Sequence, residues 1–200
     1  MDLFVDTLPY AAGTDAGGDR IEVANVDISL ETPSGLPFFL GAQLASSFTA
    51  DTVIMKNVEL QGGSYGGGNI FGVVGNQIDL QNVSITSSQG RVDFFVGSLS
   101  LIGLPEEDDS ITLTNVTIAM HPSRQGTSSQ TILTGDGNDN VTIRNSSFVN
   151  LTVDLGDGDD SLTLIDSSFI SAQLLGGNGN DRLKIRKNSG QIDFFDFENV

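Results

Sequence analysis

Three glycine-aspartate loops in the second half of the chain contain the residues best suited to chemistry. They read Gly135-Asp136-Gly137-Asn138-Asp139, Gly156-Asp157-Gly158-Asp159-Asp160 and Gly177-Asn178-Gly179-Asn180-Asp181, at intervals of 21 residues. Each loop offers carboxylates, and its glycines allow backbone conformations that expose carbonyl oxygens. Oxygens of both kinds suit a hard cation. Asp-Gly and Asn-Gly pairs also make ordinary tight turns, so both interpretations are open.

Candidates for catalysis are fewer. The acidic run Glu106-Glu107-Asp108-Asp109 has Asp93 one predicted side away, and Arg91 and Arg124 are basic residues that could lie near it. A polysaccharide lyase needs a basic residue beside cation-binding carboxylates, and a glycosidase needs two carboxylates at a set separation. Four adjacent acids are typical of a solvated turn. We therefore expect no catalytic residues, with an enzyme as the alternative.

Composition excludes several function classes. The chain has 200 residues, with 26 acidic against 9 basic ones and a net charge of −17, so nucleic acid and anionic membranes would repel it. The absence of cysteine excludes disulfide scaffolds and thiolate metal sites. No apolar run approaches the ~18 residues of a membrane span. The only histidine, His121, is expected to be a surface side chain.

The loops belong to a repeat that runs through nearly the whole chain. Two and four residues after one acidic or amide position stand aliphatic residues, such as Ile21 and Val23 in the first copy and Leu183 and Ile185 in the last. A further apolar pair follows at seven and nine residues in most copies. The shared acidic or amide position is occupied by Asp19, Asp51, Asn76, Asp109, Asp139, Asp160 and Asp181.

This spacing predicts a parallel β-solenoid. Alternating apolar residues indicate a strand with one buried face, and the alternation shifts phase at a position that favours a left-handed turn. Asparagines stacked at that turn would form an amide ladder, which we expect to face inward. Because 21 residues cannot close a core, about seven three-sided coils must stack. The ladder positions are Asn25, Asn57, Asn82, Asn115, Asn145 and Asp166.

The whole chain, 1–200, is predicted to be one all-β domain. Residues 1–18 would form an N-terminal cap or partial coil, and residues 19–181 the stacked coils. Residues 182–200 would form the last coil and a plug that contains Phe194, Phe195, Phe197 and Val200. The open strands at such an end favour either a cap or end-to-end self-association.

The three-sided coils and the asparagine ladder resemble the right-handed parallel β-helix superfamily. The loops resemble the calcium-binding nonapeptides of RTX, or haemolysin-type, proteins, written GGxGxDxUx. Residues 176–184 match every fixed position, and residues 134–142 and 155–163 match all but the first glycine. RTX rolls repeat the nonapeptide in tandem, whereas this chain has one copy per 21-residue coil.

The RTX resemblance implies that about two calcium ions bind between successive loops. Carried over by position, Asp139, Asp160 and Asp181 would supply carboxylates. The other ligands would be mostly backbone oxygens of Gly135, Asp136, Gly137, Gly156, Asp157, Gly158, Gly177, Asn178 and Gly179.

These features together predict a secreted or cell-surface bacterial protein with a structural or adhesive role. The acidic start differs from the basic start of a signal peptide, so we expect any such signal to be absent from this chain. The partner would be a surface ligand, either a carbohydrate or another surface protein, and not nucleic acid or the membrane interior. The alternative is a β-helix module that binds or cleaves polysaccharide.

Basic residues gather near the end of the chain. Lys184 and Arg186 alternate with Leu183 and Ile185, so they should point outward on the last coil. We expect them to pair with acids on the coil below. A binding patch is the alternative.

Overall fold

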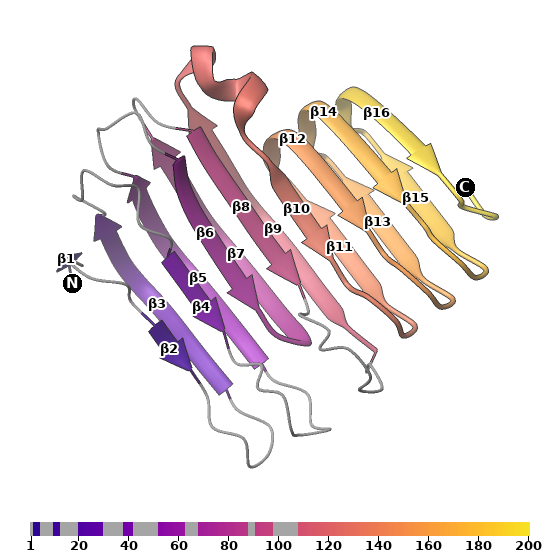
Figure 1. The fold of residues 1–200 in the computed structure, drawn as a ribbon, viewed down its shortest axis with the longest axis horizontal. Helices are drawn as coiled ribbons and strands as arrows, with labels where there is room; N and C mark the ends of the chain where they lie inside the picture. The colour runs from indigo at the N-terminus through magenta and orange to yellow at the C-terminus, as the bar shows by residue number, and fades with distance from the viewer. Residues whose placement is uncertain are drawn as a thin grey trace.

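The computed structural model describes residues 2–4, 10–12, 20–29, 38–41, 52–62, 68–87, 91–97 and 108–200. Within these ranges the chain is almost entirely parallel β-strand, with a single 3-10 helix, η1 (Pro122–Thr127), and no α-helix. Strands from successive coils lie side by side along the molecule (Figure 1), from β1 at one end to β16 at the other. No helix among the described residues is long and apolar enough to cross a membrane.

Each full coil contributes two strands. The first strand of each coil pairs in parallel with its counterpart in the next coil, and so does the second strand. The strands are β1 (Asp2–Phe4), β2 (Tyr10–Ala12), β3 (Arg20–Ser29), β4 (Phe38–Gly41), β5 (Thr52–Gly62), β6 (Gly68–Val74), β7 (Gln77–Ser87), β8 (Arg91–Gly97), β9 (Ser110–Met120), β10 (Gln130–Leu133), β11 (Asn140–Arg144), β12 (Ser147–Asp154), β13 (Ser161–Ile165), β14 (Ser168–Leu175), β15 (Arg182–Arg186) and β16 (Ser189–Phe195).

The pairing register confirms the repeat. Val141 of β11 pairs with Ile111 of β9 and with Leu162 of β13, and Leu162 pairs with Leu183 of β15. Seven coils run from β3 to β16, and the partial strands β1 and β2 pair with the first of them. The predicted β-solenoid is therefore correct.

The core is a stack of apolar columns. Val53, Ile78, Ile111, Val141 and Leu162 form one column and are at most 2% exposed. Burial of such a side chain contributes about 1.5–3 kcal/mol, so the columns are the main source of stability. Phe148 and Phe169 form a further stacked pair in the second sides of two coils, with ring centroids 6.2 Å apart.

The asparagine ladder exists, but the expectation that it faces inward is wrong. Asn57 Nδ2 donates to Asn25 Oδ1 at 2.9 Å, Asn82 to Asn57 at 2.8 Å and Asn115 to Asn82 at 2.8 Å, and all four side chains are exposed. Their φ angles lie between 53° and 55°. This left-handed turn rotates the side chain to the outside of the corner, and the next residue faces inward instead. The coils are still in register, so the amides meet on the outer surface.

The ladder positions share one backbone conformation but not one bonding pattern. Asn145, Asp166 and Lys187 also have left-handed φ angles, of 49°, 51° and 54°. Asp166 Oδ2 lies 3.8 Å from Arg186 Nη2, so this position forms an ion pair and not a hydrogen bond between side-chain amides. All ladder positions thus share the left-handed turn. Among the described residues, the hydrogen bonds between asparagine side chains join only the first four coils.

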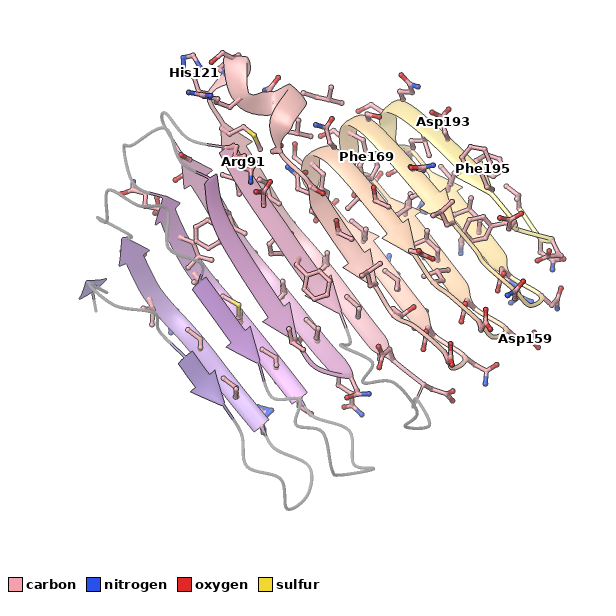
Figure 2. The ribbon with its side chains drawn as sticks, in the orientation of Figure 1. Arg91, His121, Asp159, Phe169, Asp193 and Phe195 are labelled. Carbon is pink, nitrogen blue, oxygen red and sulfur yellow. The ribbon has the colours of Figure 1, made fainter. Side chains whose placement is uncertain are left out.

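The last coil leaves part of the core open. Phe194 and Phe195 are 44% and 48% exposed and Val200 is 74% exposed, whereas Phe197 is partly buried against the core. Phe195 is visible on this coil in Figure 2. Most of the expected N-terminal cap, residues 1–18, lies outside the described residues.

Candidate cation site in the glycine-aspartate loops

The three loops stack on one another at one edge of the solenoid. Asp159 marks this edge, at the opposite end of the coils from His121 (Figure 2). Asp157 pairs in parallel with Asp136 and with Asn178. Gly137 N donates to Asp157 O at 2.9 Å and Asp157 N to Gly135 O at 3.0 Å, and the same pattern joins the second loop to the third. The loops are therefore held together by their own backbone.

This close stacking explains the glycines. A Cβ on Gly158 would lie 1.6 Å from the carbonyl oxygen of Gly137, and one on Gly179 would lie 1.7 Å from that of Gly158. Both glycines also have φ angles of 144° and 153°, which other residues rarely adopt. The extra first glycine of the third loop, Gly176, has a different cause: the carbonyl of Asp196 comes within 1.9 Å of where its Cβ would be.

The sixth-position aspartates form a buried carboxylate ladder. Each accepts, through Oδ1, the backbone N–H of its counterpart one coil earlier: Asp139 from Asp109 at 2.7 Å, Asp160 from Asp139 at 2.8 Å and Asp181 from Asp160 at 2.9 Å. Glu198 continues the column by accepting the N–H of Asp181 at 2.7 Å. All four aspartates are at most 2% exposed. In Asp139, Asp160 and Asp181, Oδ1 therefore accepts a backbone N–H group of the preceding coil.

The second oxygen of two carboxylates has no hydrogen-bond partner. Oδ2 of Asp160 and Oδ2 of Asp181 are buried and unpaired. Burial raises the pKa of Asp160 to about 7, although the N–H of Asp139 lowers it, and the neighbouring charges of Asp139 and Asp181 raise it further. Burial also raises the pKa of Asp181, with Glu198 adding to the effect. A buried oxygen of this kind destabilises the ionised state unless a proton or cation neutralises it.

The available donor atoms, carboxylate and carbonyl oxygens, are of the type that calcium binds. The loops contain buried carboxylate oxygens of Asp160 and Asp181. They also contain carbonyl oxygens of Gly137 and Gly158, which face the next loop. Calcium takes six to eight such oxygens, many of them from backbone carbonyls. Within the described ranges no three acidic or imidazole side chains are grouped around one point. A cation here would depend on backbone oxygens as much as on carboxylates.

The remaining candidate ligands lie at the surface. Asp136, Asp157 and Asn178 are exposed, and Asn178 Nδ2 donates to Asp157 Oδ1 at 2.7 Å. Asp19 and Asp51, the earliest members of the acidic column, lie outside the described residues. The side chains of the three loops therefore form an inner carboxylate ladder and a separate outer row of turn residues.

Sequence reasoning missed a second inward polar column. Ser146 Oγ accepts from Val116 N at 3.1 Å, Ser167 Oγ accepts from Ser146 N at 3.2 Å, and Asn188 Oδ1 accepts from Ser167 N at 2.8 Å. Both serines are 3% exposed. The signal was visible as serine in place of valine directly after the turn, and its role is to satisfy backbone N–H groups inside the coil.

The residues considered for catalysis have structural partners. Asp93 pairs with Arg91 at 2.8 Å and accepts the N–H of Ser129 at 2.9 Å. Asp108 accepts the N–H of Asn138 at 2.7 Å, and Glu106 and Glu107 lie outside the described residues. His121 accepts the N–H of Ser123 through Nδ1 and so caps η1.

Comparisons with known proteins return no match: no family model, no curated protein and no solved structure is similar to this chain.

Proposed function

We propose that this chain is a non-catalytic structural or adhesive solenoid that works outside the cell or at its surface and that calcium stabilises its C-terminal coils. The observation that carries the calcium part of the proposal is the pair of buried, unpartnered oxygens, Oδ2 of Asp160 and Oδ2 of Asp181. Calcium would supply positive charge to these carboxylates without the loss of the Oδ1 bonds that join the coils. Cleavage of polysaccharide is not proposed: Asp93 pairs with Arg91, and Asp108 accepts the backbone N–H of Asn138.

The charge of the two buried carboxylates sets the energetics of this site. With pKa values raised by burial, ionised Asp160 and Asp181 each cost free energy in the folded state. A site of roughly 10 µM affinity in millimolar calcium would contribute about 2.7 kcal/mol to folding. In a calcium-poor cytosol that contribution would be absent. Calcium-linked stability of this size would favour assembly of the last coils after export.

Thermal unfolding with added calcium and with chelator tests this proposal. We expect a clear rise of Tm in calcium, about two bound ions by metal assay, and little effect of magnesium, which tolerates such carbonyl-rich loops poorly. The matched control is Asp166→Asn, an exposed acid on the turn outside the loops. Equal Tm values in calcium and in chelator, with no bound metal, would leave the loops as tight turns and overturn the proposal.

A further inference from the structure

One face of the solenoid has a charge opposite to that of the molecule. It is built from the outward-facing positions of β9, β11, β13 and β15, which lie side by side (Figure 1). We call these twelve positions the basic face. They are Ser110, Thr112, Thr114, Asn140, Thr142, Arg144, Ser161, Thr163, Ile165, Arg182, Lys184 and Arg186.

The basic face contains no carboxylate. It holds four of the nine basic residues of the chain and none of its 26 acidic ones, although the net charge is −17. The other side chains are hydroxyls, one amide and Ile165. The corresponding outward positions of the earlier coils add Lys56 on β5 and Arg20 on β3. They also add two acids, and each has a partner. Glu22 pairs with Arg20 at 2.6 Å, and Asp79 accepts a hydrogen bond from Gln81 at 2.7 Å.

The cations of the last coil are available to a ligand. Arg182 and Lys184 are exposed and form no ion pair with any described residue, which contradicts the expectation that Lys184 pairs with the coil below. Arg186 does pair with an acid of the coil below, as expected, but it reaches Asp166 only at 3.8 Å and both side chains are well exposed, so this pair is weak. Ile165 is only 6% exposed although it faces outward, and Arg144 and Arg186 flank it across the strands. In this register the aliphatic parts of the two arginines are in position to cover Ile165, while their charged ends extend to the surface.

We propose that the basic face binds a linear anionic polysaccharide. Arg182, Lys184 and Arg186 alternate along one extended strand, so their charges are spaced by roughly 7 Å. The threonine, serine and asparagine rows beside them present hydroxyl and amide groups at the coil spacing of ~4.8 Å. Such a surface matches an extended polymer that carries one carboxylate or sulfate per sugar, with many hydroxyls between the charges.

Charge density favours polysaccharide over nucleic acid. Duplex DNA has one charge per roughly 1.7 Å of axis, so a molecule with a net charge of −17 would repel it strongly beyond the small basic face. A polymer with fewer charges per unit length is repelled less by the acidic surface outside the basic face. None of the twelve side chains is aromatic, so the stacking platforms that single strands use are absent from the basic face.

This inference rests on the proposed adhesive role but not on calcium. The test uses sulfated dextran, polygalacturonate, neutral dextran and duplex DNA as immobilised probes, in calcium and in chelator, with the whole chain in solution. We expect binding to one or both anionic polysaccharides that weakens with added salt, and none to neutral dextran. The double variant Lys184→Gln/Arg186→Gln should lose at least tenfold in affinity. The matched control, Arg91→Gln/Arg124→Gln, removes the same charge elsewhere and should bind normally.

Each outcome decides a separate question. Binding to sulfated dextran alone or to polygalacturonate alone identifies the anionic group. Unchanged binding by the Lys184→Gln/Arg186→Gln variant, no binding to either anionic polysaccharide, or equal binding to DNA overturns the assignment of this face. Thermal unfolding of the same samples checks that both double variants are folded. A missing calcium effect on Tm with intact polysaccharide binding would overturn only the calcium part of the proposed function.

Discussion

At the scale of single residues, the aspartates of the last coils combine two opposed effects. Oδ1 of Asp160 satisfies a buried N–H, which stabilises the coil, while its unpaired Oδ2 makes the ionised form costly. An asparagine keeps the acceptor and removes the charge. An alanine removes both, and it leaves the N–H of Asp139 without its partner.

We therefore expect Asp160→Asn to be more stable than the parent chain in chelator at pH 8, and to lose any stabilisation by calcium. Asp160→Ala should be less stable than Asp160→Asn by about 1–3 kcal/mol, the cost of an unsatisfied buried N–H. Urea unfolding of the three proteins measures these differences. Identical stabilities for the two variants would contradict the bonding role of Oδ1.

The raised pKa values of Asp160 and Asp181 predict how the stability of the folded chain changes with pH. The folded-state pKa of Asp160 is about 7, against an ordinary value of 3.8, so the folded chain binds the proton more tightly than the unfolded chain does. Its contribution to stability is therefore present at low pH and is lost as pH rises from about 4 to about 7. Asp181 acts in the same direction.

In chelator, the free energy of unfolding should fall as pH rises through this window, and Asp160→Asn should flatten the profile. Urea unfolding in half-unit pH steps measures it. A profile of the parent chain that rises with pH over the same window, or one that Asp160→Asn leaves unchanged, would contradict the assignment.

At the scale of elements, the loops depend on the close approach of backbones. The carbonyl of Gly137 occupies the place where a Cβ on Gly158 would be, and Gly179 stands in the same relation to Gly158. Nothing in this arrangement needs a side chain. The second and third loops instead require that one position, Gly158 or Gly179, has no side chain.

Gly158→Ala should therefore destabilise the chain by more than the roughly 1 kcal/mol that a strained φ angle costs by itself. It should also weaken any calcium effect, because the loops must separate. Gly126→Ala in η1 is the control, since a Cβ there has nothing within 4 Å. Thermal unfolding compares the two, and equal Tm values would show that the loops can spread at no cost.

At the scale of the whole molecule, stability should vary along the solenoid axis. β15 pairs only with β13, and β16 only with β14, so the last coil has one strand neighbour per side among the described strands. Ile185 and Phe194 are 38% and 44% exposed, whereas Leu164 and Leu174, at the same positions one coil earlier, are fully buried. End-to-end association through this coil stays a prediction.

Native-state hydrogen exchange should reveal this gradient. We expect the amides of β15 and β16 to exchange before those of β7 and β9, since each coil is stabilised mainly by its neighbours. Calcium should slow exchange in β13 to β16 more than in β7. Uniform protection along the axis would indicate that the last coil is covered, for example by a second copy.

The sequence by itself determined the architecture of this protein. Apolar residues two and four positions after a fixed column predict strands, and their copies predict the parallel register that pairs Val141 with Ile111 and Leu162. The left-handed turn was readable at Asn25 and its counterparts, because few residues adopt that conformation. The period of a repeat can be read from residues that are close in the sequence. Because each coil pairs with a copy of itself, that period also sets the register of the strands.

Only the tertiary structure decided how polar groups are used. It placed the asparagines outside the corner, aimed one oxygen of each inner aspartate at the preceding coil, and left Oδ2 of Asp160 and Asp181 without a partner. It also collected basic side chains from separate strands, such as Arg144 and Arg186, on one face. A side chain's partner is set by the coil above or below and by the rotation of each turn, and these relations form only when the coils stack.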